Sequence, residues 1–291
     1  MDYAETLAKA DTALCGCAGD RIKKNRGVKM QFGMPTLIET NTLEECADLC
    51  RDLNLNFIEL NMNLPQYQLS NINVSHFNEV ANKYGIFYTI HLDDNLNISD
   101  FNPYIAERYR RTAAETIALA KKLSVSVINM HLSRGPYFTL PDKKVCLFDK
   151  YREQYLKSIA DFRLLCETEI GETDIKMCVE NCSGFPEFQK EALNILLKSD
   201  VFGLTFDIGH NHGSAGVDEP YIIENKNRLY HMHMHDALGK KDHLALGAGE
   251  LDIDNYLYLA EDRKCRVVLE TKTIEGLKHS VSWMRQKGRI K

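Results

Sequence analysis

The feature that most constrains the fold of this chain is a regular alternation between short β-rich runs and longer segments with helical periodicity. Eight runs rich in β-branched and aromatic residues predict strands at residues 28–32, 56–61, 86–91, 126–131, 175–181, 201–207, 228–235 and 266–271. Their starts lie about 26 to 50 residues apart, which is the length of a strand–helix unit. Consecutive parallel strands need a crossover of this size, and a helix usually supplies it. Eight such units predict an α/β protein with a single (β/α)₈ barrel.

Helical segments lie between the predicted strands. "TLEECADLCRDL" places Thr42 and Glu45 at the spacing of a capping box, which predicts a helix start. "AERYRRTAAETIALAKKL", residues 106–123, carries an apolar stripe at helical spacing. We therefore predict that residues 28–291 form the barrel and that residues 1–27 form an N-terminal extension packed on it.

Composition argues against several other classes of protein. Hydrophobic residues make up 44% of the 291 positions, yet no apolar run approaches the roughly 18 residues of a membrane span, so no membrane partner is expected. The first residues lack an apolar core followed by a cleavage site, which predicts a cytoplasmic location. The nine cysteines include no two CxxC pairs, which predicts free thiols. The net charge of −5 gives no overall attraction to nucleic acid.

One stretch is unusually rich in histidine. "LYHMHMHDALGKKDHLALGAGELD", residues 229–252, holds four of the ten histidines, and His231, His233 and His235 alternate along one face of a predicted strand. Neighbours on that face lie about 6.6 Å apart, whereas a metal ion lies only ~2.1 Å from an imidazole nitrogen. One or two of the three can therefore reach the same ion. The deepest is expected in the core, and the shallowest, His235, at the mouth facing the substrate.

Other polar residues are predicted at the same end of the barrel. Active sites of (β/α)₈ barrels lie at the carboxyl ends of the strands. There the sequence places His91, His131, Glu180, Asp207, His210 and Glu270. Each histidine taken alone is also consistent with a structural, hydrogen-bonded role. The carboxylates are harder to explain as structural residues, because burying a charged carboxylate costs free energy unless it is paired or coordinates a metal. A divalent metal ion would neutralise all of them.

Five motifs resemble those of the xylose isomerase-like barrel superfamily, which contains sugar isomerases and epimerases together with endonuclease IV-type nucleases. The motifs are "CVEN" at 178–181, "FDIGH" at 206–210, "HMHD" at 233–236, "DHLALGAGELD" at 242–252 and "VLET" at 268–271. The resemblance extends over residues 28–287. It implies that four residues bind one divalent ion: Glu180, Asp207, His233 and Glu270. Their mixed oxygen and nitrogen ligands suit Mn²⁺, Zn²⁺, Co²⁺ or Mg²⁺.

The epimerase branch of the resemblance implies a metal-dependent sugar or sugar phosphate isomerase or epimerase. Glu180 and Glu270 would flank the sugar, one removing a proton next to the carbonyl and the other returning one, while the metal polarises the carbonyl and stabilises the enediolate. Asp207 would be a ligand only, and His210 would bind a substrate hydroxyl.

Two basic residues are expected near the mouth of the barrel as well. Lys272 and Arg134 would bind the substrate together with His235. The two basic side chains would hold a phosphate or carboxylate of the substrate. A solvated side chain is the alternative for each of these two.

The nuclease branch implies instead a zinc phosphodiesterase that acts on abasic-site DNA with three zinc ions. The positions of its further ligands are occupied by His91, His131, His210 and His243. The third zinc requires an Asp-x-His sequence, but Lys241 stands two residues before His243. "HLDDNLN" has two carboxylates, one of them where the nuclease inserts a tyrosine into DNA, and carboxylates repel a phosphate backbone.

We therefore favour the isomerase or epimerase, with a small-molecule sugar as partner and nucleic acid as the less favoured one. The endonuclease IV-like phosphodiesterase is the alternative, and a non-catalytic or unassigned metal-binding barrel is a third. The sequence leaves open whether one or several ions bind and whether the chain forms a homo-oligomer.

Overall fold

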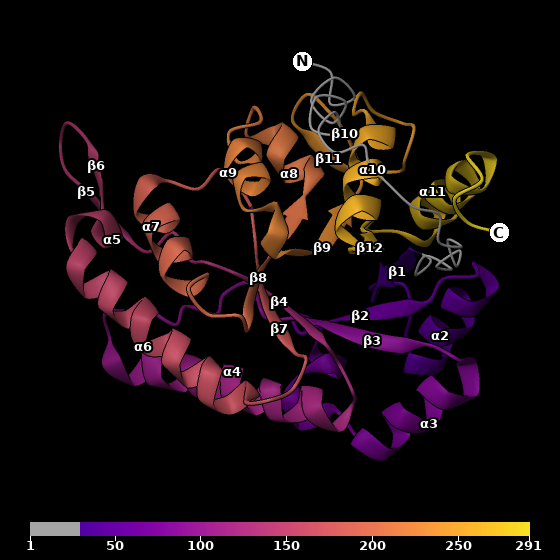
Figure 1. The fold of residues 1–291 in the computed structure, drawn as a ribbon, viewed down its shortest axis with the longest axis horizontal. Helices are drawn as coiled ribbons and strands as arrows, with labels where there is room; N and C mark the ends of the chain where they lie inside the picture. The colour runs from indigo at the N-terminus through magenta and orange to yellow at the C-terminus, as the bar shows by residue number, and fades with distance from the viewer. Residues whose placement is uncertain (1–29) are drawn as a thin grey trace, which may run out of the picture.

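Eight parallel strands form the centre of the protein in a computed structural model that describes residues 30–291. The strands are β1 (Gln31–Pro35), β2 (Phe57–Asn61), β3 (Phe87–His91), β4 (Val127–His131), β7 (Lys176–Glu180), β8 (Phe202–Asp207), β9 (Leu229–Met234) and β12 (Arg266–Leu269). Each pairs with the next barrel strand along the chain, and β12 pairs with β1, so the barrel is closed (Figure 1). The predicted (β/α)₈ barrel is confirmed.

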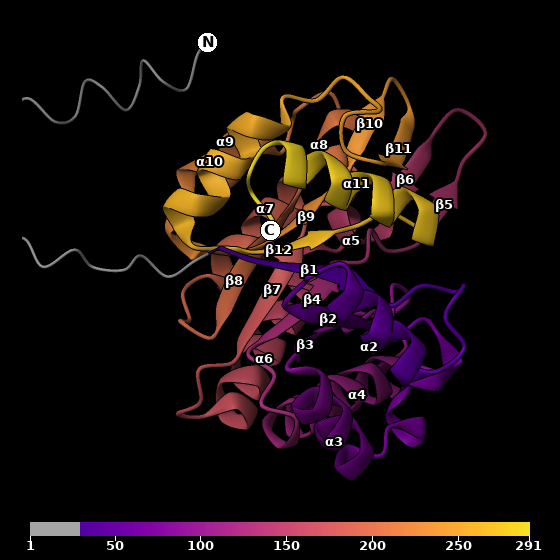
Figure 2. The ribbon, with the colours of Figure 1, turned by 90° about the vertical axis from the view of Figure 1, so that its right-hand side faces the viewer.

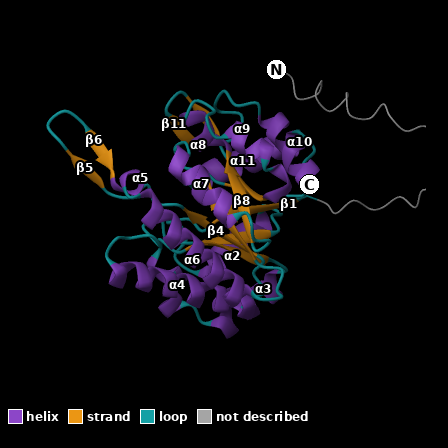
Figure 3. Ribbon diagram, turned by 60° about the vertical axis from the view of Figure 1, so that its left-hand side comes forward, coloured by secondary structure: helices purple, strands orange, loops and turns teal. Residues whose placement is uncertain are grey.

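Helices surround the strands (Figure 3). The long ones are α2 (Leu43–Asp52), α3 (Val74–Tyr84), α4 (Pro103–Lys122), α6 (Arg152–Ile170), α7 (Glu187–Leu196), α10 (Ile253–Arg263) and α11 (Ile274–Gln286). Shorter turns of helix lie in the connections, at α5 (Leu147–Lys150), α8 (Ile208–Gly213), α9 (Glu219–Glu224), η1 (Pro65–Tyr67), η2 (Leu69–Asn71) and η3 (Lys226–Arg228). The connection from β8 to β9 thus uses short helices where the other strands are followed by one long helix.

Local capping chemistry explains where two of the helices begin. Thr42 accepts a hydrogen bond from the backbone N–H of Glu45 at 3.1 Å, as its sequence spacing predicts. Helix α4 begins at Pro103, three residues before the predicted start, because Asn102 caps the N–H of Tyr104 and proline fits the first turn of a helix.

The first strand lies three residues later than the sequence pattern predicts. The prediction was residues 28–32, whereas β1 covers Gln31–Pro35 and pairs Gly33 with Phe57 of β2. A Cβ atom on Gly33 would lie 2.4 Å from the Phe57 ring, so the strand position depends on the absence of a side chain there. Glycine and proline are turn signals in a sequence, which explains why the predicted strand ended too early.

Two β-hairpins follow barrel strands at their carboxyl ends. One is formed by β5 (Tyr137–Thr139) and β6 (Lys144–Cys146), and the other by β10 (Asp236–Leu238) and β11 (Lys241–Leu244). Figure 2 shows both on the same side of the barrel. They build up the face at which (β/α)₈ barrels carry their active sites.

The two faces of β9 have opposite chemistry. Met232 and Met234 belong to the apolar core between the strands and the helices, whereas His231 and His233 are equally buried but take part in polar contacts inside the barrel. The predicted alternation of β9 is therefore present, and it turns a row of imidazoles inward.

The predicted N-terminal extension, residues 1–27, lies outside the described residues. Within residues 30–291, no helix combines the length and the apolar character that crossing a membrane requires.

Candidate metal centre

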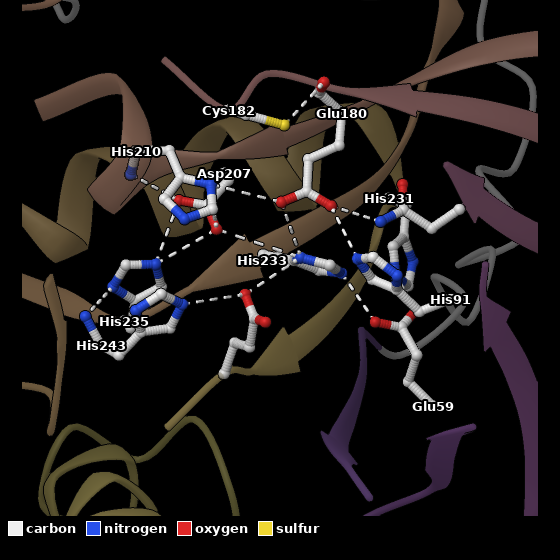
Figure 4. A network of polar contacts seen from close by, with 12 residues as sticks. Glu59, His91, Glu180, Cys182, Asp207, His210, His231, His233, His235 and His243 are labelled. Carbon is white, nitrogen blue, oxygen red and sulfur yellow. Dashed lines mark hydrogen bonds and ion pairs between the residues drawn. The ribbon is translucent and has the colours of Figure 1, made fainter. Parts of the chain in front are cut away.

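Four polar side chains converge at the carboxyl ends of β7, β8, β9 and β12. They are Glu180, Asp207, His233 and Glu270, the four residues that the sequence suggests as metal ligands. One ligand atom from each lies within 4.8 Å of those of the other three (Figure 4). The Nδ1 atom of His233 is 3.1 Å from Glu270 Oε2 and 3.3 Å from Glu180 Oε1. All four side chains are buried, so the site is formed within the barrel rather than on its surface.

Buried carboxylates this close to one another need positive charge. Burial raises the pKa of Glu180, but His233 and His131 outweigh burial and hold that pKa well below its usual range. Burial likewise raises the pKa of Glu270, and His233 followed by Lys272 brings it well below the ordinary value. Burial would lower the pKa of His233, but the carboxylates around it raise that pKa well above normal. The protein alone therefore places an imidazolium among anionic carboxylates.

The same residues fit a divalent cation. His233 Nδ1 and Glu270 Oε2 are buried and lack a hydrogen-bond partner within residues 30–291. A metal ion bound by three carboxylates and one neutral imidazole would use these atoms and replace the charge of the imidazolium.

Glu59 determines which nitrogen of His233 faces the site. Its Oε1 lies 2.8 Å from His233 Nε2, and its Oε2 lies 2.7 Å from His231 Nε2. Thr89 donates a hydrogen bond to this carboxylate at 3.0 Å. A proton on His233 Nε2, the nitrogen beside the Glu59 carboxylate, leaves the Nδ1 lone pair to the ligand atoms. The sequence did not indicate this role for Glu59; the only signal is an acidic residue within the apolar strand "FIELN".

His91 and His131 lie beside Glu180 on the side away from Asp207. Their Nε2 atoms are 3.3 Å and 3.2 Å from Glu180 Oε2. The Nδ1 of His91 lies 2.8 Å from the carbonyl of Leu92, which assigns the proton of a neutral ring to Nδ1 and leaves an Nε2 lone pair facing the carboxylate. Without a metal ion, burial lowers the pKa of His91, but Glu180 raises it to about 9. Ligand atoms of His91 and His131 also converge with that of Asp94, all within 4.8 Å of one another, so these three residues could hold a second cation beside Glu180.

His210 and His243 approach the four-residue cluster from the mouth. His210 follows Asp207 in α8, where the Asp207 carboxylate caps the His210 N–H at 2.7 Å. The His210 Nδ1 lies 3.4 Å from Asp207 Oδ2 and 3.5 Å from Glu180 Oε1. His243 is more distant, with Nε2 3.9 Å from Glu270 Oε2.

The sequence predicts His235 at the mouth of the barrel, but this prediction is wrong. The structure buries its side chain completely. The β10–β11 hairpin folds back over the end of β9, and the backbone N–H of His243 donates to His235 Nδ1 at 2.7 Å. The other ring nitrogen lies 3.1 Å from both carboxylate oxygens of Asp207. Both ring nitrogens are therefore occupied within the protein.

The two basic residues singled out from the sequence have different surroundings. Lys272 lies 2.7 Å from Glu270 Oε1, and about half of its side chain remains exposed. Arg134 donates to the backbone carbonyls of Ser183 and Gly184, which joins the loop after β4 to the loop after β7. Its side chain also lines a small cavity with Glu180.

The comparisons with known proteins agree with this architecture. A family model described as xylose isomerase-like TIM barrel matches residues 47–287. The chain belongs to this family. An uncharacterized protein of Methanocaldococcus jannaschii is 24% identical over 242 residues, which cover 78% of this chain and 83% of that protein.

Solved structures share the barrel of this xylose isomerase-like chain. A D-tagatose 3-epimerase-like protein superposes with a TM-score of 0.71 at 21% identity, covering 88% of this chain and 96% of that one. A 3-keto-D-glucoside 4-epimerase from E. coli gives a TM-score of 0.70 at 15% identity, covering 89% and 100%. An IolI protein with a bound zinc atom gives 0.65 at 17% identity, covering 89% and 96%. At these identities the likeness concerns the fold.

Two asparagines in this xylose isomerase-like barrel support the predicted ligands: Asn129 of β4, and Asn181 at the end of the "CVEN" motif. Asn129 of β4 donates to Glu180 Oε2. Asn181 accepts from the backbone N–H of Asp207 and donates to its carbonyl, both at 2.9 Å. These contacts fix the ends of β4, β7 and β8 relative to one another, so the ligands are held before any ion binds.

Proposed function

We propose that this chain is a divalent-metal-dependent isomerase or epimerase of a sugar or sugar phosphate. The observation that carries the proposal is the convergence of two ionised glutamates, Glu180 and Glu270, on one imidazole nitrogen of His233. Asp207 completes the set of ligands. The names of similar structures support the same chemistry, since they include a D-tagatose 3-epimerase-like protein and an IolI protein with zinc.

The two glutamates supply the proton transfers. When bound, the metal would polarise the carbonyl of the substrate and make the neighbouring C–H more acidic. Both carboxyl groups have pKa values well below the ordinary range, so each is ionised at neutral pH and either can accept that proton. The other glutamate must first take up a proton from solvent, which it then delivers to the enediolate, while the glutamate that accepted the substrate proton releases it to solvent. The 2.7 Å ion pair with Lys272 favours the anionic form of Glu270 at the start of this cycle.

The surrounding residues are assigned to substrate binding in this proposal. His210 is only partly buried, and it would donate to a hydroxyl of the sugar. Lys272 and Arg134 would contact a phosphate or carboxylate near the mouth, using the donors that their protein partners leave available.

Proton exchange with solvent tests the proposal. The protein is loaded with Mn²⁺, Co²⁺ or Zn²⁺ and incubated in D₂O with free and phosphorylated ketoses, D-tagatose, D-allulose and D-fructose among them. We expect deuterium at a carbon adjacent to the carbonyl in the recovered sugar, and loss of this exchange in Glu180→Gln or Glu270→Gln. An absence of exchange across the panel, in protein shown to contain metal, would argue against the proposal.

A zinc phosphodiesterase acting on abasic-site DNA is the second candidate. The specific observation in its favour is the placement of His91 and His131 beside Glu180 Oε2, which would suit a second ion bridged by that carboxylate. Asp94 also lies beside these histidines, with its carboxylate 3.4 Å from His131 Nδ1, and unless a cation neutralises it this negative charge repels a DNA backbone. Stoichiometric cleavage of an abasic duplex at physiological salt, lost in Glu270→Gln, would favour this function over the first.

A further inference from the structure

His235 lies next to the β10–β11 hairpin and connects two segments that are distant in the sequence. Its Nε2 lies 3.1 Å from both oxygens of the Asp207 carboxylate, while its Nδ1 accepts the backbone N–H of His243 at 2.7 Å. Figure 4 shows the ring between Asp207 and His243. His235, the residue between β9 and β10, thus joins a candidate metal ligand on β8 to the β10–β11 hairpin.

The contact with the hairpin determines which nitrogen of His235 carries the proton. A backbone N–H can only donate, so Nδ1 must accept, and in a neutral ring the proton then lies on Nε2. The Asp236 carbonyl is also near Nδ1, but at 3.3 Å it is the longer contact. In this tautomer the imidazole donates to Asp207, and the carboxylate receives this donor in addition to the His210 N–H at 2.7 Å.

The hairpin places the His243 N–H by adopting a costly backbone conformation. His243 has φ of 52°, in the left-handed region that residues other than glycine seldom occupy. Its ring stacks on that of His235, with centroids 4.2 Å apart and planes 9° from parallel. Asp236 secures the following loop by accepting backbone N–H groups from Ala237, Gly247, Gly249 and Leu251. The surrounding loop therefore stabilises the strained residue.

We propose that His235 is a positioning residue for the metal ligand Asp207, and that the β10–β11 hairpin sets the metal affinity of the site through it. This inference rests on the proposed function only in requiring a divalent ion at Glu180, Asp207, His233 and Glu270. When the hairpin is closed, its amide holds His235 in the tautomer that orients the Asp207 carboxylate. When the hairpin opens, His235 can rotate or change tautomer, and Asp207 loses a donor. Linkage requires the converse: a bound ion favours the closed hairpin.

A glycine provides a second way to disturb His235. A Cβ atom on Gly209 would lie 2.0 Å from the His235 ring, so Gly209→Ala must displace the imidazole without altering it chemically. His76 is the control histidine, since it lies on α3 and pairs with the exposed Glu44 of α2, apart from the four ligands and the hairpin.

The test is Mn²⁺ affinity, measured by isothermal titration calorimetry on the full chain. We expect an affinity loss of about 10-fold or more for His235→Ala and for Gly209→Ala, since partners that orient a ligand typically contribute that much. His235→Gln, which retains an N–H donor, should recover part of the loss, and His76→Ala should stay within twofold of wild type. Wild-type affinity in both His235→Ala and Gly209→Ala would overturn this inference while leaving the proposed function in place. A wild-type protein that binds no divalent ion would overturn both.

Hydrogen exchange tests the hairpin directly and does not depend on a variant that folds. The backbone amide of His243 should exchange more slowly in wild-type protein saturated with Mn²⁺ than in the metal-free protein. Equal exchange rates in the two forms, with the metal shown to be bound, would contradict the coupling between hairpin and site.

Discussion

The variant Glu59→Gln tests how much the orientation of His233 contributes to metal affinity, because it leaves the ligand His233 itself unchanged. Glu59 is buried, and its two oxygens lie 2.8 Å and 2.7 Å from the Nε2 atoms of His233 and His231. The glutamine has nearly the same volume but no charge, so packing is retained while the hydrogen bond with His231 and the ion pair with His233 are both weakened. Its amide can also present a donor to Nε2, which would favour the wrong tautomer of His233.

The expected loss of metal affinity follows from the burial of these contacts and from their short distances. Partners that orient a metal-bound histidine are worth about 10–100-fold in affinity, or about 1.4–2.8 kcal/mol. Because the Glu59–His233 contact is short and shielded from solvent, we expect the upper part of that range, about 30–100-fold. Competition between the protein and a chelating dye for Mn²⁺ measures the loss. Glu115→Gln, which removes a charge from an exposed pair with Arg111, is the control. Wild-type Mn²⁺ affinity in Glu59→Gln would refute the reasoning.

Three further predictions concern the site as a whole. Glu180→Gln and Glu270→Gln should each weaken metal binding and abolish turnover while circular dichroism shows the fold intact; full Mn²⁺ affinity in both would count against the ligand assignment. In a chelator-treated protein, the free energy of unfolding should fall as the pH rises from about 6.5 through 9. Glu180 raises the pKa of His91 to about 9 in the folded protein, so the proton that stabilises the folded state is lost over that interval. Urea titrations at pH 6, 7.5 and 9 check this, and His91→Gln should have a flatter profile if the assignment is correct. Mn²⁺ at about 1,000 times its dissociation constant should stabilise the fold by roughly 4 kcal/mol, reversed by chelator, and a metal-independent melting temperature would contradict it.

The strands could be predicted because they depend on local patterns. Polar residues at the carboxyl ends of β-rich runs must lie at one face of a parallel barrel, which placed Glu180, Asp207 and Glu270 together. The strand pattern did not decide which histidine of β9 joins them, and His233 was singled out only by the resemblance to the xylose isomerase-like barrels.

Contacts between distant segments could not be predicted in the same way. Glu59 and His231 are 172 residues apart, and only closure of the barrel brings them together. The burial of His235 depends on a hairpin that folds back over β9, which strand periodicity does not reveal. His235→Ala should therefore lower the melting temperature, since both ring nitrogens are hydrogen-bonded inside the protein.

The metal content of the purified chain tests the central claim most directly. Wild-type protein and His233→Ala are equilibrated with Mn²⁺ or Zn²⁺, passed through a desalting column and analysed by mass spectrometry for ions per chain. We predict at least one tightly bound ion per wild-type chain and its loss in His233→Ala, with His76→Ala retaining the wild-type content. A wild-type chain that retains no divalent ion, or a His233→Ala chain that retains as much as wild type, would contradict the assignment of the metal centre.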